Sequence, residues 1–188
     1  MVYSHRRQKA VDLLVKLELD ALVFCQPENI RYLCGFTGSD AALIVFSDQL
    51  VFLTDSRYTT QSNAEVTADQ ICEYKLKIEG IASQLTSHDV SRVGFESTLP
   101  FGFAKELQEQ GNADCQWLHL KEELQSLRLH KTSDEIEFLA SAADLNAAAF
   151  AEVIHMIRPG TKESEVALAL EFAMRRLGAE EKAFDVIV

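Results

Sequence analysis

The chain opens with a helical pattern of apolar positions followed by a strand-like one. Residues 4–18 predict an amphipathic helix, because apolar side chains recur at helical spacing between lysines and arginines. These apolar positions are Ala10, Val11, Leu14 and Leu17. The continuous apolar run Ala21–Cys25 then predicts a short buried strand. Pro27 suits the first turn of a short helix, where its missing N–H would have no helical partner anyway.

A β-hairpin is predicted between residues 41 and 54. Two β-prone runs, Ala41–Phe46 and Leu50–Thr54, are separated by Ser47-Asp48-Gln49, which is a typical hairpin turn. Asp55 or Ser56 can cap the helix that we expect next.

Strands and helices continue to alternate up to about residue 126. The segments 71–76, 92–95 and 116–120 predict strands, and Phe101–Gln110 predicts a helix that ends at Gly111. Such alternation indicates an α/β domain. Because a hairpin requires antiparallel neighbours, the sheet must be mixed rather than wholly parallel.

The pattern changes near residue 127 to a long helix. Thr132 followed by Glu135 is typical of a capping box. Apolar side chains then recur every three or four residues, at Ile136, Leu139, Ala143, Ala147, Phe150, Ile154 and Ile157. A helix of roughly 23 residues would be about 34 Å long, and Pro159-Gly160 would end it.

A second helix and the start of a strand are predicted after Pro159-Gly160. The inward positions of that helix are Val166, Ala169, Leu170, Ala173 and Leu177, with Gly178 as its C-cap. Ala183–Val188 has the pattern of a strand. Two helices and one strand cannot bury their own apolar faces well, so we expect the chain to stop inside a second domain.

Composition excludes some classes of function. The chain has 188 residues, 29 of them acidic and 18 basic, which gives a net charge of −11. Because no basic block is present to neutralise phosphates, nucleic-acid binding is not expected. We also expect no membrane association and a cytoplasmic location, since the chain shows neither an apolar signal core nor a membrane-length apolar run.

Cysteines and histidines do not indicate a metal site. The four cysteines are widely spaced, without a Cys-x-x-Cys pair, and are interpreted as buried free thiols. The five histidines form no His-x-x-x-His pair. Glu152 lies one helical turn from His155, and we interpret this pair as a surface ion pair rather than as two ligands.

The segment Gly35-Phe36-Thr37-Gly38-Ser39-Asp40 admits two interpretations. It could be an anion-binding nest or a Ser/Asp catalytic pair. Alternatively, it is a corner whose glycines supply positive φ angles, with Ser39 or Asp40 bonded to local backbone. We favour the corner, because no histidine or lysine lies nearby in the sequence to activate Ser39.

Asp55-Ser56-Arg57-Tyr58 also admits two interpretations. Asp55 suits a helix N-terminus, and Arg57 can pair with Asp55 or with Asp40, which would be structural roles. In the functional interpretation, Arg57 reaches a carboxylate of a substrate or of a neighbouring subunit. We favour the structural roles here.

An ordered series of segments resembles the Xaa-Pro aminopeptidase and Xaa-Pro dipeptidase (prolidase) family, to which creatinase is related. The segments Asp20–Val23, Pro27–Leu33, Gly35–Ser39 and Thr54–Tyr58 resemble its N-terminal domain. Those that resemble the opening of its pita-bread metallopeptidase domain are Leu127-Arg128, Lys131, Glu135-Ile136, Arg158–Gly160, Glu165-Val166, Arg175–Ala179 and Phe184–Val188.

The resemblance implies a fold and a division into domains. Residues 1–126 would form a creatinase-like N-terminal α/β domain with a mixed, ribonuclease-H-like sheet. Residues 127–188 would be the incomplete, helical start of a pita-bread α+β domain.

The resemblance also implies an activity for the parent protein. Members of the family hydrolyse the bond before proline with two divalent metal ions, often manganese, held by carboxylates and a histidine. All of these ligands would lie beyond residue 188. The chain alone would therefore have no catalytic or metal-binding residue and be inactive.

Partners follow from the same resemblance. Proline-containing peptides would be the parent's substrates, and this domain would help to form a homodimer or a higher homo-oligomer. It would also restrict access to a neighbouring active site, with Asp40 and Arg57 lining the entrance.

Two alternatives remain open. The chain could belong to a non-catalytic pita-bread protein that binds partners, or to a creatinase-type C–N hydrolase. The first would lack the downstream metal ligands that a peptidase needs, and the second would differ from it in pocket residues.

Overall fold

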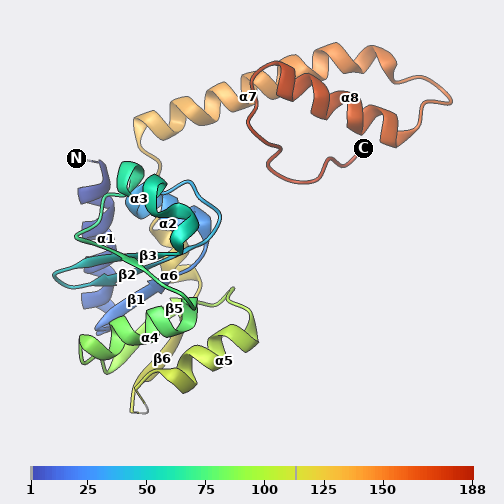
Figure 1. Cartoon of the computed structure of the whole chain (residues 1–188). Helices are drawn as coiled ribbons and strands as arrows, with labels where there is room; N and C mark the ends of the chain where they lie inside the picture. The colour runs from blue at the N-terminus through green and yellow to red at the C-terminus, as the bar shows by residue number, and fades with distance from the viewer. Residues whose placement is uncertain (1, 113) are drawn as a thin grey trace. The chain divides into compact units, whose positions relative to one another are not determined.

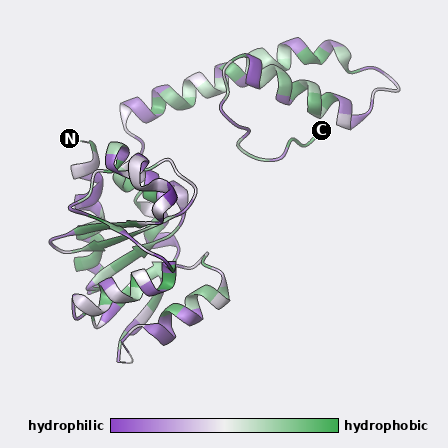
Figure 2. Ribbon diagram, viewed as in Figure 1, coloured by the Kyte–Doolittle hydropathy of each residue, from purple (hydrophilic) through white to green (hydrophobic). Residues whose placement is uncertain are grey.

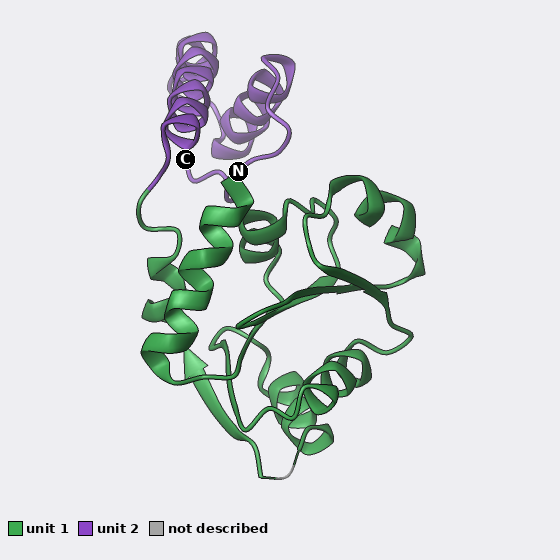
Figure 3. Ribbon diagram, turned by 90° about the vertical axis from the view of Figure 1, so that its left-hand side faces the viewer, with its two compact units in different colours: residues 1–130 green, residues 131–188 purple. Residues whose placement is uncertain are grey.

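The computed structural model describes residues 2–112 and 114–188, and the chain forms two compact units, residues 1–130 and 131–188 (Figure 3). Each unit has a hydrophobic core of its own. The pattern-based domain division lies at 126/127, four residues before the division between the units. Leu127 is buried in the core of the first unit, because the helix before it packs there.

The first unit is built on a six-stranded sheet with the order β4-β3-β2-β1-β5-β6 (Figure 1). The strands are β1 (Ala21–Phe24), β2 (Ala41–Phe46), β3 (Leu50–Thr54), β4 (Gln70–Glu73), β5 (Arg92–Glu96) and β6 (Gln116–Leu120). β2 is antiparallel to both of its neighbours, and the other pairs are parallel. The predicted mixed α/β sheet is confirmed.

The predicted hairpin is formed by β2 and β3, which pair in the register Leu43↔Phe52. The Phe46 N–H donates to the carbonyl of Gln49 at 2.8 Å and closes the turn. The hairpin therefore places one antiparallel strand among five that run in the same direction.

Helices cover both faces of the sheet (Figure 1). They are α1 (Val2–Leu17), α2 (Pro27–Cys34), α3 (Thr59–Glu65), α4 (Lys77–Ser87), α5 (Phe101–Gln110) and α6 (Glu122–Ser126). α1, α2 and α6 pack on one face, and α4 and α5 pack on the other. A short 3-10 helix, η1 (Ser56–Tyr58), precedes α3.

The central strands are apolar on both faces, as their green ribbons in Figure 2 show. Successive side chains of a strand point to opposite faces. In β1, Leu22 and Phe24 enter the core under α1, whereas Ala21 and Val23 enter the core under α4. Because β1, β2 and β3 are buried on both faces, β1 and β2 are continuous apolar runs and β3 is apolar up to its last residue, Thr54.

The pattern was least informative around β4 and α4. A strand was predicted at 71–76, but β4 ends at Glu73, and a helix not predicted from the sequence begins at Lys77. β4 is a short, mostly exposed edge strand, so little burial fixes its end. α4 is held by Ile81, Ala82 and Leu85, which pack on the sheet.

The second unit pairs two helices through small side chains. They are α7 (Ser133–Val153), extended by the 3-10 turn η2 (Ile154–Met156), and α8 (Glu163–Arg176). Ala149 and Val153 of α7 pack against Val166 and Ala173 of α8. The predicted capping box is confirmed at Thr132, which accepts the Glu135 N–H.

Three details of the second unit differ from the prediction. The last turn of the long helix is 3-10, because the chain tightens before Pro159. Leu177 is exposed rather than inward, since α8 ends at Arg176 and Gly178 turns the chain with a φ of +107°. Residues 183–188 form no strand, because a strand needs a hydrogen-bonded neighbour.

Phe52 provides a test of the two-sided core. It is fully buried and lies 4.8 Å from the ring of Phe36 in an edge-on contact. Phe52→Ala should lower the free energy of unfolding of the first unit by about 3–5 kcal/mol, the usual cost of a cavity of this size. Phe101→Ala is the matched control because Phe101 is 83% exposed, and it should change stability by less than about 0.5 kcal/mol in urea titrations. Equal losses would contradict the assigned core.

Candidate functional site

Charged side chains of the first unit gather at one edge of the sheet. β1, β3, β4, β5 and β6 all end at this edge, and β2 begins there. We call it the carboxyl edge. Asp40 precedes β2, Asp55 follows β3 and Glu96 ends β5. Open α/β sheets bind ligands at this edge, so it is the first place to look for a site.

Asp40 and Arg57, the two predicted entrance residues, lie together here. Asp40 Oδ1 accepts a hydrogen bond from Lys77 Nζ at 2.8 Å, and Arg57 Nη2 lies 3.6 Å from Asp40 Oδ2. Asp40 thus faces two cations. The predicted pairing of Arg57 with Asp40 is confirmed, and the contribution of Lys77 was not foreseen because α4 was not predicted.

Asp55 holds Arg57 in a two-pronged ion pair. Arg57 Nε and Nη2 donate to the carboxylate at 3.0 and 2.6 Å, and the Arg57 backbone N–H donates at 2.9 Å, which caps η1. The hydrogen bond from Arg57 lowers the pKa of Asp55. Two-thirds of the Arg57 side chain is still exposed, so a fixed guanidinium faces solvent.

Tyr74 lies buried beside this group. Its hydroxyl has no hydrogen-bond partner among residues 2–112 and 114–188. Burial, followed by the negative charge of Asp40, raises the pKa of Tyr74 well above its usual value. Tyr74 therefore stays a neutral phenol and offers no base to the site.

The Gly35–Asp40 corner is structural. Gly35 ends α2 with a φ of +91°, as predicted. Gly38 has no positive φ, contrary to the prediction; it is needed for space, since a Cβ there would lie 2.3 Å from Phe36 and 2.8 Å from Tyr58. Ser39 Oγ lies 2.7 Å from the Tyr58 hydroxyl, and this contact ties the corner to η1 rather than activating a nucleophile.

Glu96 forms a second cluster at the carboxyl edge, between the ends of β1 and β5. It is only 3% exposed. Its oxygens accept the backbone N–H groups of Cys25 and Gln26 at 2.7 and 2.9 Å and the Asn29 side-chain amide at 2.6 Å. Glu96 thus anchors the start of α2, where a negative charge is also favourable to the helix dipole.

Burial and hydrogen bonding act in opposite directions on Glu96. Burial raises its pKa, and the three N–H donors lower it; burial has the larger effect. Sequence reasoning missed Glu96 because its partners lie about 70 positions earlier. The only available signal was a glutamate directly after the uncharged segment Val93-Gly94-Phe95 of a predicted strand.

Burial favours the protonated form of all four cysteine thiols. Burial raises the pKa of Cys25 to about 12 and that of Cys34 to about 11. Cys72 and Cys115 are partly exposed, and burial raises the pKa of each. All four are free thiols, as predicted, but only Cys34 is fully buried; the prediction of burial is wrong for Cys25, Cys72 and Cys115, which are partly exposed.

Within the described ranges, no three or more His, Cys, Asp or Glu side chains come together in a way that could hold a metal ion. The predicted ion pair of Glu152 with His155 is not formed. Glu152 pairs instead with Arg176 of α8.

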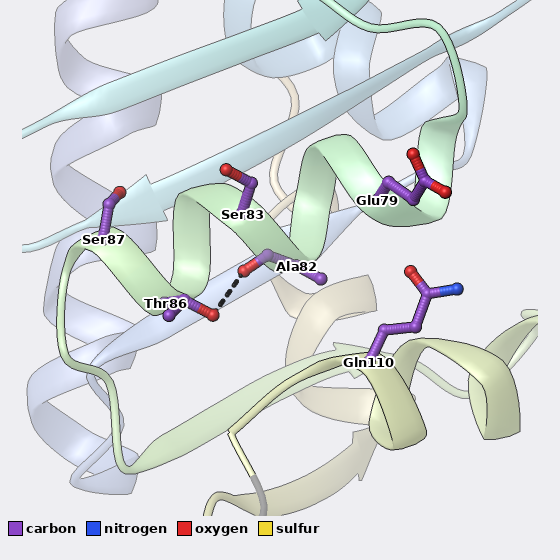
Figure 4. Close-up of a pocket in the computed structure, with 6 residues that line it drawn as sticks. All are labelled: Glu79, Ala82, Ser83, Thr86, Ser87 and Gln110. Atoms are coloured by element: carbon purple, nitrogen blue, oxygen red, sulfur yellow. Dashed lines mark hydrogen bonds between the residues drawn. The ribbon is translucent and has the colours of Figure 1, made fainter.

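The groove between α4 and α5 offers little chemistry (Figure 4). Its polar lining is Glu79, Ser83, Thr86, Ser87 and Gln110. The Thr86 hydroxyl is used within the helix, where it donates to the Ala82 carbonyl at 2.9 Å.

Among the helices of the described segments, none is both long enough and apolar enough to cross a membrane.

Comparison with known proteins identifies the family. Residues 6–130 match the creatinase/prolidase N-terminal domain, which covers well over half of the chain. The chain belongs to the creatinase/prolidase family. Residues 137–188 match metallopeptidase family M24, so the resemblance found in the sequence is confirmed for both parts of this creatinase/prolidase chain.

Three relatives illustrate the match. An uncharacterized peptidase of Bacillus subtilis, YqhT, is 33% identical over 96% of this chain and 52% of its own length. The Xaa-Pro dipeptidase structure from Bacillus anthracis has a TM-score of 0.89 at 29% identity, covering 97% of this chain and 52% of that one. The X-Pro aminopeptidase structure from Thermotoga maritima has a TM-score of 0.78 at 26% identity, covering 93% and 51%.

These matches confirm the predicted fold class, a creatinase-like N-terminal domain followed by part of a pita-bread domain. The creatinase/prolidase chain spans about half the length of the relatives it matches. The activity and partners of a whole protein are therefore a matter of proposal.

Glu96 can be tested by two substitutions of similar size. In Glu96→Leu, two backbone N–H groups and the Asn29 amide lose their acceptor, and we expect a loss of about 3 kcal/mol in the free energy of unfolding. In Glu96→Gln, the amide oxygen can still accept both backbone N–H groups while a flipped Asn29 amide accepts from the new NH₂. Its loss should stay below about 1 kcal/mol in urea titrations. Equal losses for the two variants would show that the hydrogen bonds do not matter.

Proposed function

We propose that this chain is the N-terminal part of a proline-specific exopeptidase that hydrolyses Xaa-Pro peptide bonds in the cytoplasm. The observation that supports this best is the match over 97% of the chain to a structure described as an Xaa-Pro dipeptidase. The M24 match over residues 137–188 supports metallopeptidase chemistry in the parent.

The parent would use two divalent metal ions, with manganese as the expected ion. The residues described here do not fit such a centre, since they bring together no group of metal-binding side chains. We therefore assign no step of hydrolysis to this chain and propose that the 188-residue chain alone is inactive.

The role proposed for the first unit is oligomerisation and control of access to the active site. Arg57 supports this role because its guanidinium is fixed by Asp55 and still faces solvent. A fixed fork of this kind suits the carboxylate of a peptide or of a neighbouring subunit. Asp40 would orient Arg57 and Lys77 rather than contact the peptide, because both cations already lie against it.

The activity can be tested by comparing the 188-residue chain with the longest protein that its gene encodes. Both are assayed on an Xaa-Pro dipeptide and a longer Xaa-Pro peptide, with manganese and with a chelator. We expect metal-dependent cleavage by the longer protein and none by a chain whose mass confirms that it ends at Val188. Cleavage by the short chain, or none by the longer protein, would contradict the proposal.

The access role can be tested in the longer, active protein. Arg57→Gln should raise KM for Xaa-Pro peptides by about threefold to tenfold and leave kcat within about twofold, because binding rather than chemistry loses an interaction. Arg175→Gln is the matched control, since Arg175 is also exposed and pairs with glutamates of its own unit. Light scattering of both variants shows whether an effect comes from altered assembly. An unchanged KM for Arg57→Gln would exclude it from the entrance.

A further inference from the structure

A small cavity lies at the carboxyl edge where β1 and β5 end side by side. After β1, the chain enters α2, which packs on one face of the sheet; after β5, it enters α5, which packs on the other. Neighbouring parallel strands whose connections leave in opposite directions create a crevice, and α/β proteins bind ligands in such crevices. The cavity is about 60 Å³, comparable to the space of about two water molecules.

Some polar groups that line the cavity already have hydrogen-bond partners, and others do not. Glu96 belongs to the first kind, because both of its carboxylate oxygens accept hydrogen bonds from N–H groups. Residues of α6 and of the segments that flank it also line the cavity, and they include Lys121 and Arg128. Arg128 Nε is buried, and no residue among 2–112 and 114–188 accepts a hydrogen bond from it. A buried donor without an acceptor is costly and calls for an unseen partner.

The hydrogen-bond donors around the cavity suit an anion. Lys121 already pairs with Glu122, whose Oε1 lies 3.8 Å from its Nζ, so Arg128 is the cation of the cavity lining with a buried donor still to be satisfied. Gln125 can add a further N–H donor and Thr98 a hydroxyl. A planar carboxylate would accept two parallel hydrogen bonds from the guanidinium.

We propose that this cavity, between the ends of β1 and β5 and the α6 segment, binds a small carboxylate on Arg128. The ligand class is a free monocarboxylate or the carboxylate end of a small molecule. A dianion such as phosphate fits less well, because its second negative charge would have no cation to pair with and would lie beside Glu96, which lines the same cavity. This site does not depend on the proposed peptidase activity.

The Nε–H groups of arginines give a direct readout by ¹H–¹⁵N NMR. The ¹⁵N-labelled 188-residue chain is titrated with sodium acetate, and with sodium chloride and sodium phosphate at equal ionic strength. The signal lost in Arg128→Lys identifies Arg128. We expect this signal to shift with acetate in a saturable way, not to shift with chloride, and to respond to phosphate at least threefold more weakly.

Two variants provide the controls. Arg128→Lys keeps the charge but loses the planar fork, and should weaken acetate binding at least tenfold, followed at the Thr98 amide. Arg158→Lys changes an exposed arginine outside the cavity and should leave binding unchanged. A shift that does not saturate, an equal response to chloride, tighter binding of phosphate, or an unchanged affinity in Arg128→Lys would each overturn the proposal. No response to acetate would leave only water in the cavity and would overturn it as well.

Discussion

Burial of the central strands on both faces is the constraint on which the first unit depends. β1, β2 and β3 carry no charged side chain on either face, so the charged groups beside them lie where these strands begin or end. All strands except β2 end at the same edge, which brings acidic groups that are far apart in the sequence to one border. Burial of the central strands on both faces thus explains both the apolar core and the gathering of charged side chains at the carboxyl edge.

The two acidic clusters at that border are stabilised in different ways. Asp40 is balanced by cations, Lys77 and Arg57, at a partly exposed site. Glu96 is buried and is balanced by neutral N–H donors. An ion pair near solvent can exchange partners at little cost, whereas a buried carboxylate held by backbone cannot. Exchange of contacts with another molecule is therefore expected at Arg57 and not at Glu96.

The sequence predicted those features that depend on local patterns. The hairpin, the helix that ends at Gly111 and the capping box at Thr132 each follow from a few neighbouring residues, and each is present. β4 and α4 were misjudged because β4 is an exposed edge strand. For the candidate site, the pairing of Arg57 with Asp55 was foreseeable from their spacing. The contacts of Lys77 with Asp40 and of Glu96 with α2 depend on sheet topology, which no local pattern encodes.

The anchoring of α2 by Glu96 has a consequence for the order of folding. α2 begins at Pro27 and has no side-chain cap of its own. The N–H groups of Cys25 and Gln26, which lead into α2, find their acceptor 71 and 70 residues later in the chain. Contacts between such distant residues are slow to form, because a long loop must close first. On a ribosome, the turn that leads into α2 stays unanchored until β5 has emerged and paired with β1, so the middle of this sheet is completed late.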